Sequence, residues 1–187
     1  PPEHFERIAA FLALTDRGPM PIPYDPANKV LPPGAGLVVR RQAWLENVPD
    51  ERTLAEKFGD REAGEDLEVV LRIQKAGWSV WYNAHMWMHH DIPGHRLTRE
   101  YLLKLFKGIG LSRYHTRMLS VTPGRRPVML ILYALNDLRK IGRHVVRYRQ
   151  QVITDTVAAS EMMLYVMSFV SPFHSWYRLL RRRCSRS

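Results

Sequence analysis

An α/β fold followed by a helical C-terminal extension is the fold class that the sequence predicts. Apolar residues with a helical period follow Glu65-Asp66. Aromatic and β-branched residues, which favour strands, cluster between Gly77 and His90. Long segments with a helical period then follow Thr98, and basic residues accumulate toward the C-terminus. A helix, a short β region and several further helices are therefore expected in that order.

A short helix and a proline-rich loop are expected first. Residues 4–14 place Phe5, Ile8, Ala9 and Leu12 on one helical face, and residues 18–33 contain several prolines. A strand is expected near Leu37-Val38-Val39, after the glycine-containing run Gly34-Ala35-Gly36. The glycines allow close backbone approach, either to a ligand or to a packed neighbour.

The stretch around Asp66 carries the strongest chemical signal. Leu67, Val70, Leu71 and Gln74 follow it at helical spacing, so Asp66 is expected at or near a helix N-terminus. Free N–H groups and the helix dipole there favour the ionised carboxylate, which a general base needs. An Asp at this place is also a common N-cap, and the spacing alone leaves both roles open. Lys75 and Gly77 predict the end of the helix.

Two strands are expected after this helix. Trp78-Ser79-Val80-Trp81-Tyr82 forms the first, and Met86-Trp87-Met88-His89-His90 forms the second, before the turn at Pro93-Gly94. His89 and His90 alternate across a strand, so at most one is expected to face a site. A histidine at a strand end is also commonly a hydrogen-bonded structural residue. The three Trp residues of this region could stack on a ligand or lie in the core.

Helices dominate the remainder of the predicted fold. Thr98 is expected to cap a helix that runs to about Tyr114, with Leu102, Leu105, Phe106 and Ile109 on its buried face. Further helices are expected over about 127–150 and 153–182.

The order of these motifs resembles the acceptor half of family 2 glycosyltransferases with the GT-A fold. Leu31 to Arg41 resembles their Gly-Ala acceptor loop and strand, and Gly64 to His90 resembles their base helix and following strands. Residues 92–102 and 108–113 resemble a narrower group, the glycosyltransferases of hormogonium polysaccharide clusters. The resemblance covers roughly residues 10–140. It implies a partial GT-A fold, the C-terminal half of the sheet, with residues 1–120 as the acceptor-side half. The charge and apolar pattern of residues 121–187 predict a basic amphipathic helical extension.

The resemblance also implies an inverting transfer from a nucleotide sugar to a growing polysaccharide or glycolipid acceptor. It assigns the base role to Asp66, with Glu65 as its neighbour. Gly34, Ala35, Gly36, Trp87 and Arg96 are implied to bind substrate, although Arg96 could equally be a surface residue. His90, with His89 as the rival, is implied to reach a divalent metal, Mn²⁺ or Mg²⁺.

The family's nucleotide-binding half, with its Asp-x-Asp metal motif, has no counterpart before Leu31. Thirty residues cannot build a βαβ unit and several strands. The chain is therefore expected to be the C-terminal part of a longer enzyme, inactive alone. The metal is expected to be shared with the missing half.

The formal net charge of +10 favours negatively charged binding partners. Residues 135–187 carry ten Lys or Arg against three acidic residues. One apolar run, 128–135, precedes this basic segment, and another, 162–173, lies within it. Neither run reaches the roughly 18 to 20 apolar residues of a spanning helix. A cytoplasmic protein, peripheral at an anionic membrane surface, is expected. Packing of these helices on each other or on the missing half is the alternative.

A basic membrane-surface or nucleic-acid-binding module without catalysis is the other class that the charge allows. The sequence shows no nucleic-acid motif, and such a module would leave Glu65-Asp66 without a role. No nucleic-acid partner is expected. Cys184 is the single cysteine, so an internal disulfide is excluded, and a reducing compartment is compatible.

Overall fold

The computed structural model of the protein describes residues 1–25, 32–48, 65–119 and 121–184. Contacts divide the chain into two units, Phe5–Ile92 and Pro93–Ser187, the latter including Pro1–His4. The described part is mostly helical, with a small antiparallel sheet. Of the predicted α/β class, the β part is therefore represented only by this two-stranded sheet. The division at Ile92 also differs from the expected boundary at residue 120.

The sheet of the first unit pairs β1 (Ile22–Pro23) with β2 (Trp81–Tyr82), in the register Ile22 to Tyr82 and Pro23 to Trp81. The predicted strand at 86–90 is absent, so that prediction is wrong. Asn83 explains the difference, because its Oδ1 accepts a hydrogen bond from His85 N at 3.0 Å. This Asx turn directs the chain away from the sheet directly after β2.

The predicted strand near Val38 is also wrong. Leu37 N donates to Gly34 O at 3.2 Å, and Gly36 has φ +78°. This turn is followed by extended backbone and then α1 (Arg41–Asn47), so residues 37–40 pair with no described strand. Residues 4–14 form two short 3₁₀ turns, Phe5–Arg7 and Ala9–Leu12, rather than the predicted helix.

Helix α3 (Glu65–Lys75) confirms the predicted helix, with Glu65 and Asp66 in its first turn. Its C-terminus is a Schellman motif: Gly77 has φ +94°, Gly77 N donates to Gln74 O, and Trp78 N donates to Ile73 O. Trp78 packs on a core cluster of Ala43, Val69 and Ile73 from α1 and α3. The glycine at this position therefore fixes how the chain leaves α3 and enters β2.

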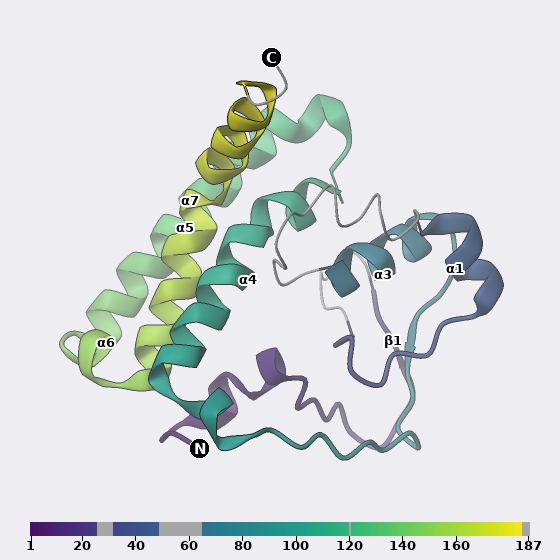
Figure 1. Ribbon diagram of the computed structural model, residues 1–187, viewed down its shortest axis with the longest axis horizontal. Helices are drawn as coiled ribbons and strands as arrows, with labels where there is room; N and C mark the ends of the chain where they lie inside the picture. The colour runs from purple at the N-terminus through teal and green to yellow at the C-terminus, as the bar shows by residue number, and fades with distance from the viewer. Residues whose placement is uncertain (26–31, 49–64, 120, 185–187) are drawn as a thin grey trace. The chain divides into compact units, whose positions relative to one another are not determined.

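The second unit is built on α4 (Arg99–Leu119), α5 (Arg126–Tyr148), α6 (Gln151–Thr154) and α7 (Thr156–Cys184). The predicted helices are confirmed, and α4 starts after Thr98, whose Oγ1 accepts from Tyr101 N at 3.4 Å. Figure 1 shows α5 and α7 running alongside each other, with α6 between their connected ends. The fully buried side chains of Leu102 and Phe106 lie on the predicted face of α4.

Helix α7 packs closely on α4 at a glycine. A Cβ atom added to Gly110 would lie 2.5 Å from Met167 Cβ and 3.0 Å from Leu164 O. Only a residue without a side chain permits this backbone approach. The contact places α4 with α7 in one unit, although the predicted boundary at residue 120 separated them.

A buried ion pair joins three helices of this unit. The carboxylate of Asp137 on α5, 1% exposed, accepts from Arg117 Nη1 at 2.6 Å and Nη2 at 2.8 Å on α4. Ser168 Oγ of α7 also donates to Asp137 Oδ2, at 2.9 Å. Burial and the charge of Arg117 lower the pKa of the nearby Arg113 guanidinium, while Asp137 acts in the opposite direction.

Helix α7 also contains a proline, Pro172. A proline has no N–H to donate to the carbonyl four residues earlier, which is Ser168 O. The hydroxyl of Ser171 donates to this carbonyl at 2.6 Å, and both serine residues are buried. The side chain of Ser171 therefore replaces the missing backbone bond.

Asp155 is the N-cap of α7, with its Oδ1 accepting from Ala158 N at 2.6 Å. Asp155→Ala is expected to lower the free energy of unfolding by about 1 kcal/mol, because an N–H group of the first turn loses its partner. Asp155→Asn retains a capping oxygen and serves as the control. Chemical denaturation measures both, and equal stability of the parent and the Ala variant would contradict the capping role.

Candidate functional site

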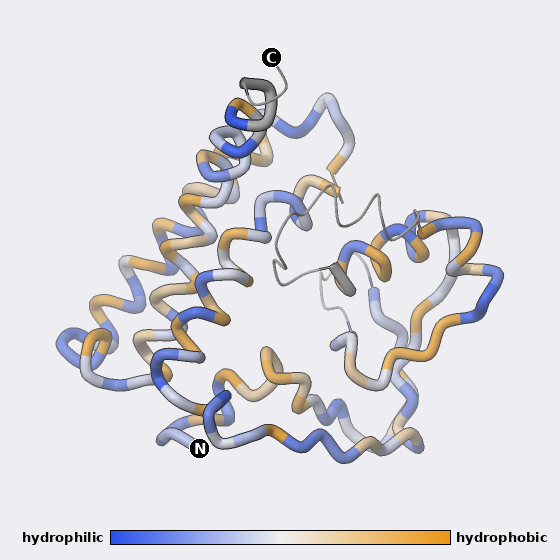
Figure 2. The backbone as a smooth tube through the Cα atoms, in the orientation of Figure 1, coloured by the Kyte–Doolittle hydropathy of each residue, from blue (hydrophilic) through white to orange (hydrophobic). Residues whose placement is uncertain are grey.

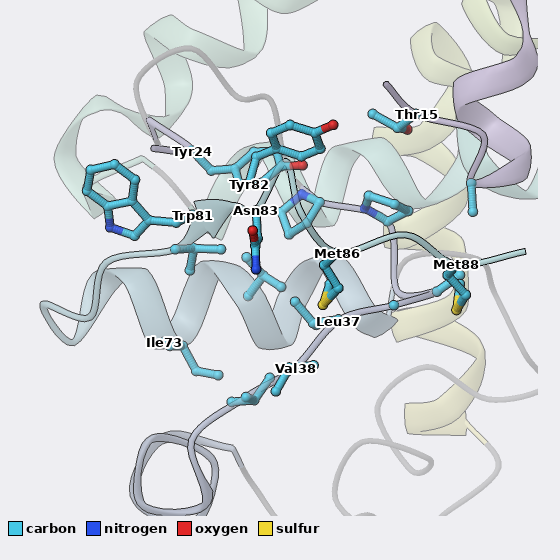
Figure 3. Close-up of a pocket in the computed structure, with 18 of the residues that line it drawn as sticks. Thr15, Tyr24, Leu37, Val38, Ile73, Trp81, Tyr82, Asn83, Met86 and Met88 are labelled. Carbon is cyan, nitrogen blue, oxygen red and sulfur yellow. The ribbon is translucent and has the colours of Figure 1, made fainter. Parts of the chain in front are cut away.

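A pocket of about 950 Å³ lies within the first unit. Three segments that are distant in sequence meet there: residues 32–40, the α3 side chains Val70 and Ile73, and residues 78–90. Residues 13–16 close another part of the rim. Figure 3 shows Leu37, Val38, Met86 and Met88 around this space.

Polar side chains form part of the pocket lining, among them those of Thr15, Asp16, Arg40 and Ser79. Tyr82 Oη donates to Asp16 Oδ1 at 3.4 Å, and Asp16 Oδ1 also accepts from Gly18 N at 2.8 Å. Asn83 and His90 also line the pocket. An apolar wall with a few convergent polar groups is typical of a small-molecule site.

His89 and His90 differ in their position relative to the pocket. His90 is half-buried and lines the pocket, whereas His89 is exposed and is not among the lining residues. The Nδ1 atom of His90 is buried and has no hydrogen-bond partner. A ligand atom in the pocket could supply that partner, so His90 is the member of the pair that suits a binding role.

The predicted acceptor loop reaches the pocket in part. Ala35 and Gly36 line it, while Gly34 forms the start of the adjoining turn and is not a lining residue. Gly36 faces Met88, since an added Cβ would lie 3.5 Å from Met88 Cε. The loop and the segment before His90 therefore contact each other at the pocket.

Two of the three Trp residues in the 78–90 segment lie outside the core. Trp81 is 58% exposed and Trp87 is 80% exposed, and both line the pocket. Trp78 is half-buried against the α1 and α3 cluster. An indole that is this exposed beside a pocket is available for stacking on a ligand.

The predicted catalytic pair can be placed only by its backbone. Glu65 and Asp66 open α3, the helix that supplies Val70 and Ile73 to the pocket, and their side chains lie outside the described part of the structure. Arg96 belongs to the second unit, where its Nε donates to Tyr101 Oη at 2.8 Å. Arg96 is not among the residues that line the pocket of the first unit.

Sequence reasoning missed several polar residues of this region. Asp16, Tyr82 and Asn83 line the pocket, and no motif marked them. Glu68 was also missed: it is fully buried, and its Oε1 accepts from Arg72 Nε at 2.9 Å. Glu68 shares a helical face with Arg72 and Lys75, so the sequence pattern gave no signal of its burial.

A divalent metal site is not complete in the described residues, which contain no group of three His, Cys, Asp or Glu side chains able to hold a metal ion. His90 would supply at most one ligand. Comparison with known proteins gives no further assignment, since no family model, curated protein or solved structure matches the chain.

Proposed function

We propose that this chain is the acceptor-side part of an inverting family 2 glycosyltransferase with a GT-A fold. The observation that carries the proposal is the meeting of its separate motifs around one pocket. Ala35 and Gly36 of the acceptor loop, Val70 and Ile73 of the base helix, and His90 all line it. Proteins of this family would bind a saccharide acceptor at such a place, next to the base.

The proposed chemistry is a single displacement. An acceptor hydroxyl attacks the anomeric carbon of a nucleotide sugar, the carbon–oxygen bond to the diphosphate breaks, and Asp66 takes the hydroxyl proton. General-base catalysis of this kind contributes on the order of 10² to 10⁴ in rate. Glu65 orients the base or binds acceptor hydroxyls, and Trp87 stacks on the acceptor. The acceptor is a growing polysaccharide or a glycolipid.

The leaving diphosphate requires positive charge. In the proposal, Mn²⁺ or Mg²⁺ supplies it, bound jointly by a preceding nucleotide-binding half and by His90. Arg96 would provide a further positive group. The donor sugar is selected by the preceding half, so this chain alone is expected not to turn over nucleotide sugars.

Asp66→Asn tests the proposal in the gene product that includes the nucleotide-binding half. We expect sugar transfer to fall by about 10² or more, with little change in melting temperature, because Asn keeps a capping oxygen but is no base. Asp155→Asn, a cap substitution in the other unit, is the matched control and should keep full turnover. Unchanged turnover of Asp66→Asn would refute the base role.

The proposed location is the cytoplasmic face of the membrane, where the enzyme is peripheral. One observation bears on it: residues Thr156–Arg178 of α7 are long and apolar enough to cross a membrane. The apolar run at 162–173, too short by itself to span, is thus part of a longer segment that has the length and composition of a span. Such a helix also occurs in the cores of soluble proteins, and the first turn of α7 is buried in the second unit.

A further inference from the structure

Helix α5 exposes a stripe of large apolar side chains, unlike a surface helix of a water-soluble bundle. Its buried residues are the polar Asp137 and His144. Its exposed residues include a series of large apolar side chains, namely Val128, Ile131, Leu132, Leu135 and Leu138, which are 48–62% exposed. In water, the apolar stripe of a surface helix normally faces the core. The outward stripe of α5 therefore needs an apolar environment.

Helix α7 extends the same surface. The large apolar residues of its C-terminal half are exposed by 36–62%: Val170, Phe173, Trp176, Tyr177 and Leu180. The first half of α5 and this half of α7 are neighbours, since Tyr133 and Ala134 line the same small cavity as Phe169 and Pro172. We call these ten residues of α5 and α7 the outer apolar face. Figure 2 shows hydrophobic segments along both helices.

The charges around the outer apolar face are positive. Arg125, Arg126, Arg139 and Arg181 are exposed at or near the ends of these helix segments. The acidic residues of α5 and α7 are Asp137 and Glu161, whose side chains are only 1% and 15% exposed. The two helices therefore present apolar and basic groups without an exposed carboxylate.

We infer that the outer apolar face lies in the interface of an anionic membrane, with its Arg residues among the lipid headgroups. Apolar area combined with flanking Arg is what binds a helix to such a surface. Trp176 and Tyr177 are residue types that favour the headgroup level. This inference specifies the surface behind the proposed peripheral location, and it does not depend on glycosyl transfer.

The second unit indicates an interfacial position rather than a span by α7. The first turn of α7 is fully or almost fully buried at Val157, Ala158, Ala159 and Ser160. Gly110 holds α7 against α4, a helix that carries several Lys and Arg residues. Crossing the bilayer would require α7 to leave this packing.

Vesicle partition of the chain tests the inference. The test variant combines Ile131→Gln, Leu135→Gln and Phe173→Gln, all at exposed positions, so its fold should remain intact by circular dichroism. We expect it to bind vesicles of phosphatidylcholine and phosphatidylglycerol about 100-fold more weakly than the parent, because binding scales with the apolar area inserted. Phosphatidylcholine alone should bind the parent poorly.

A matched control combines Met20→Gln, Leu45→Gln and Ile153→Gln. These side chains are 60–76% exposed and belong to neither α5 nor α7. The control should bind like the parent. Brominated lipid should quench parent fluorescence, and Trp176→Phe should remove most of that quenching.

Several results would overturn the inference. Equal binding by the two triple variants would show that the outer apolar face is not the contact. A parent that ignores anionic vesicles but forms dimers, which the test variant does not form, would make the face a contact between copies of the chain. If the parent stays bound to the vesicles both at high salt and after alkaline extraction, a membrane-spanning α7 would be favoured instead. None of these results would alter the outcome of the Asp66→Asn transfer assay.

Discussion

Replacing Asp137 by Ala is expected to lower the free energy of unfolding by about 3 to 5 kcal/mol, the range found when one partner of a buried ion pair is removed. The Asp137 carboxylate is 1% exposed, and it accepts both guanidinium hydrogen bonds of Arg117. Without it, Arg117, which is 14% exposed, keeps its charge in a desolvated site. Urea denaturation of the parent and the variant measures this loss.

The surroundings of Asp137 increase this cost. Burial already lowers the pKa of Arg113, as does the positive charge of Arg117, and Asp137 is the carboxylate that opposes both effects. Burial likewise lowers the pKa of Lys140, followed by the charge of Arg113. Asp137 is thus the counter-charge to several cations, and its loss leaves them in mutual repulsion.

Two further variants show whether the ion pair itself is responsible. Asn136→Ala changes the neighbouring residue on α5, whose Oδ1 accepts an exposed hydrogen bond from Arg139, and should alter stability by less than about 0.5 kcal/mol. The double variant Arg117→Met with Asp137→Leu should recover most of the stability, since apolar replacement of a whole buried pair is often neutral. A double variant as unstable as Asp137→Ala would assign the loss to packing.

Gly110→Ala is expected to destabilise the second unit by about 2 to 3 kcal/mol. The new methyl group would lie 2.5 Å from Met167 Cβ, 3.0 Å from Leu164 O and 3.2 Å from Ser168 N. Two of these are backbone atoms of α7 and none is the end of a flexible chain, so α4 and α7 must separate. Overpacking of this kind typically costs 1–3 kcal/mol, which exceeds the higher helix propensity of Ala.

Gly108→Ala is the matched control on the same helix. No atom lies within 4 Å of a Cβ added there, so the substitution should stabilise the protein by up to about 1 kcal/mol through helix propensity alone. The two glycine variants should therefore shift the melting temperature in opposite directions. A stabilising Gly110→Ala would show that the close approach of α4 and α7 does not exist.

The sequence was sufficient to predict α3, α4, α5 and α7, because each has a sustained apolar period, whereas residues 4–14 form 3₁₀ turns in place of the predicted helix. Thr98 and Gly77 marked a start and an end that the structure contains. The strands were predicted less well. Residues 86–90 have strand-forming side chains, but a strand also needs a partner, and the Asn83 turn removes this segment from β2.

The part of the candidate site that consists of recognisable sequence motifs could be predicted. The expected base helix, acceptor loop and His90 line one pocket, whereas Gly34 and His89 do not, and Arg96 belongs to the other unit. Asp16, Tyr82 and Asn83 were not predicted, since each stands alone in its segment and only folding brings them together. The exposed apolar side of α5 was also unpredictable, because the periodicity of a helix does not reveal which side faces outward.

The proline of α7 divides this helix into two mechanically distinct segments. Before Ser168, the helix is anchored by the Gly110 contact and the Asp137 hydrogen bond. Beyond Pro172, its large apolar side chains are exposed, and one hydroxyl of Ser171 replaces the backbone bond at the junction. Bending at this junction breaks fewer backbone bonds than bending elsewhere along the helix. The outer segment of α7 can therefore tilt to follow a curved surface while the rest of the helix stays fixed.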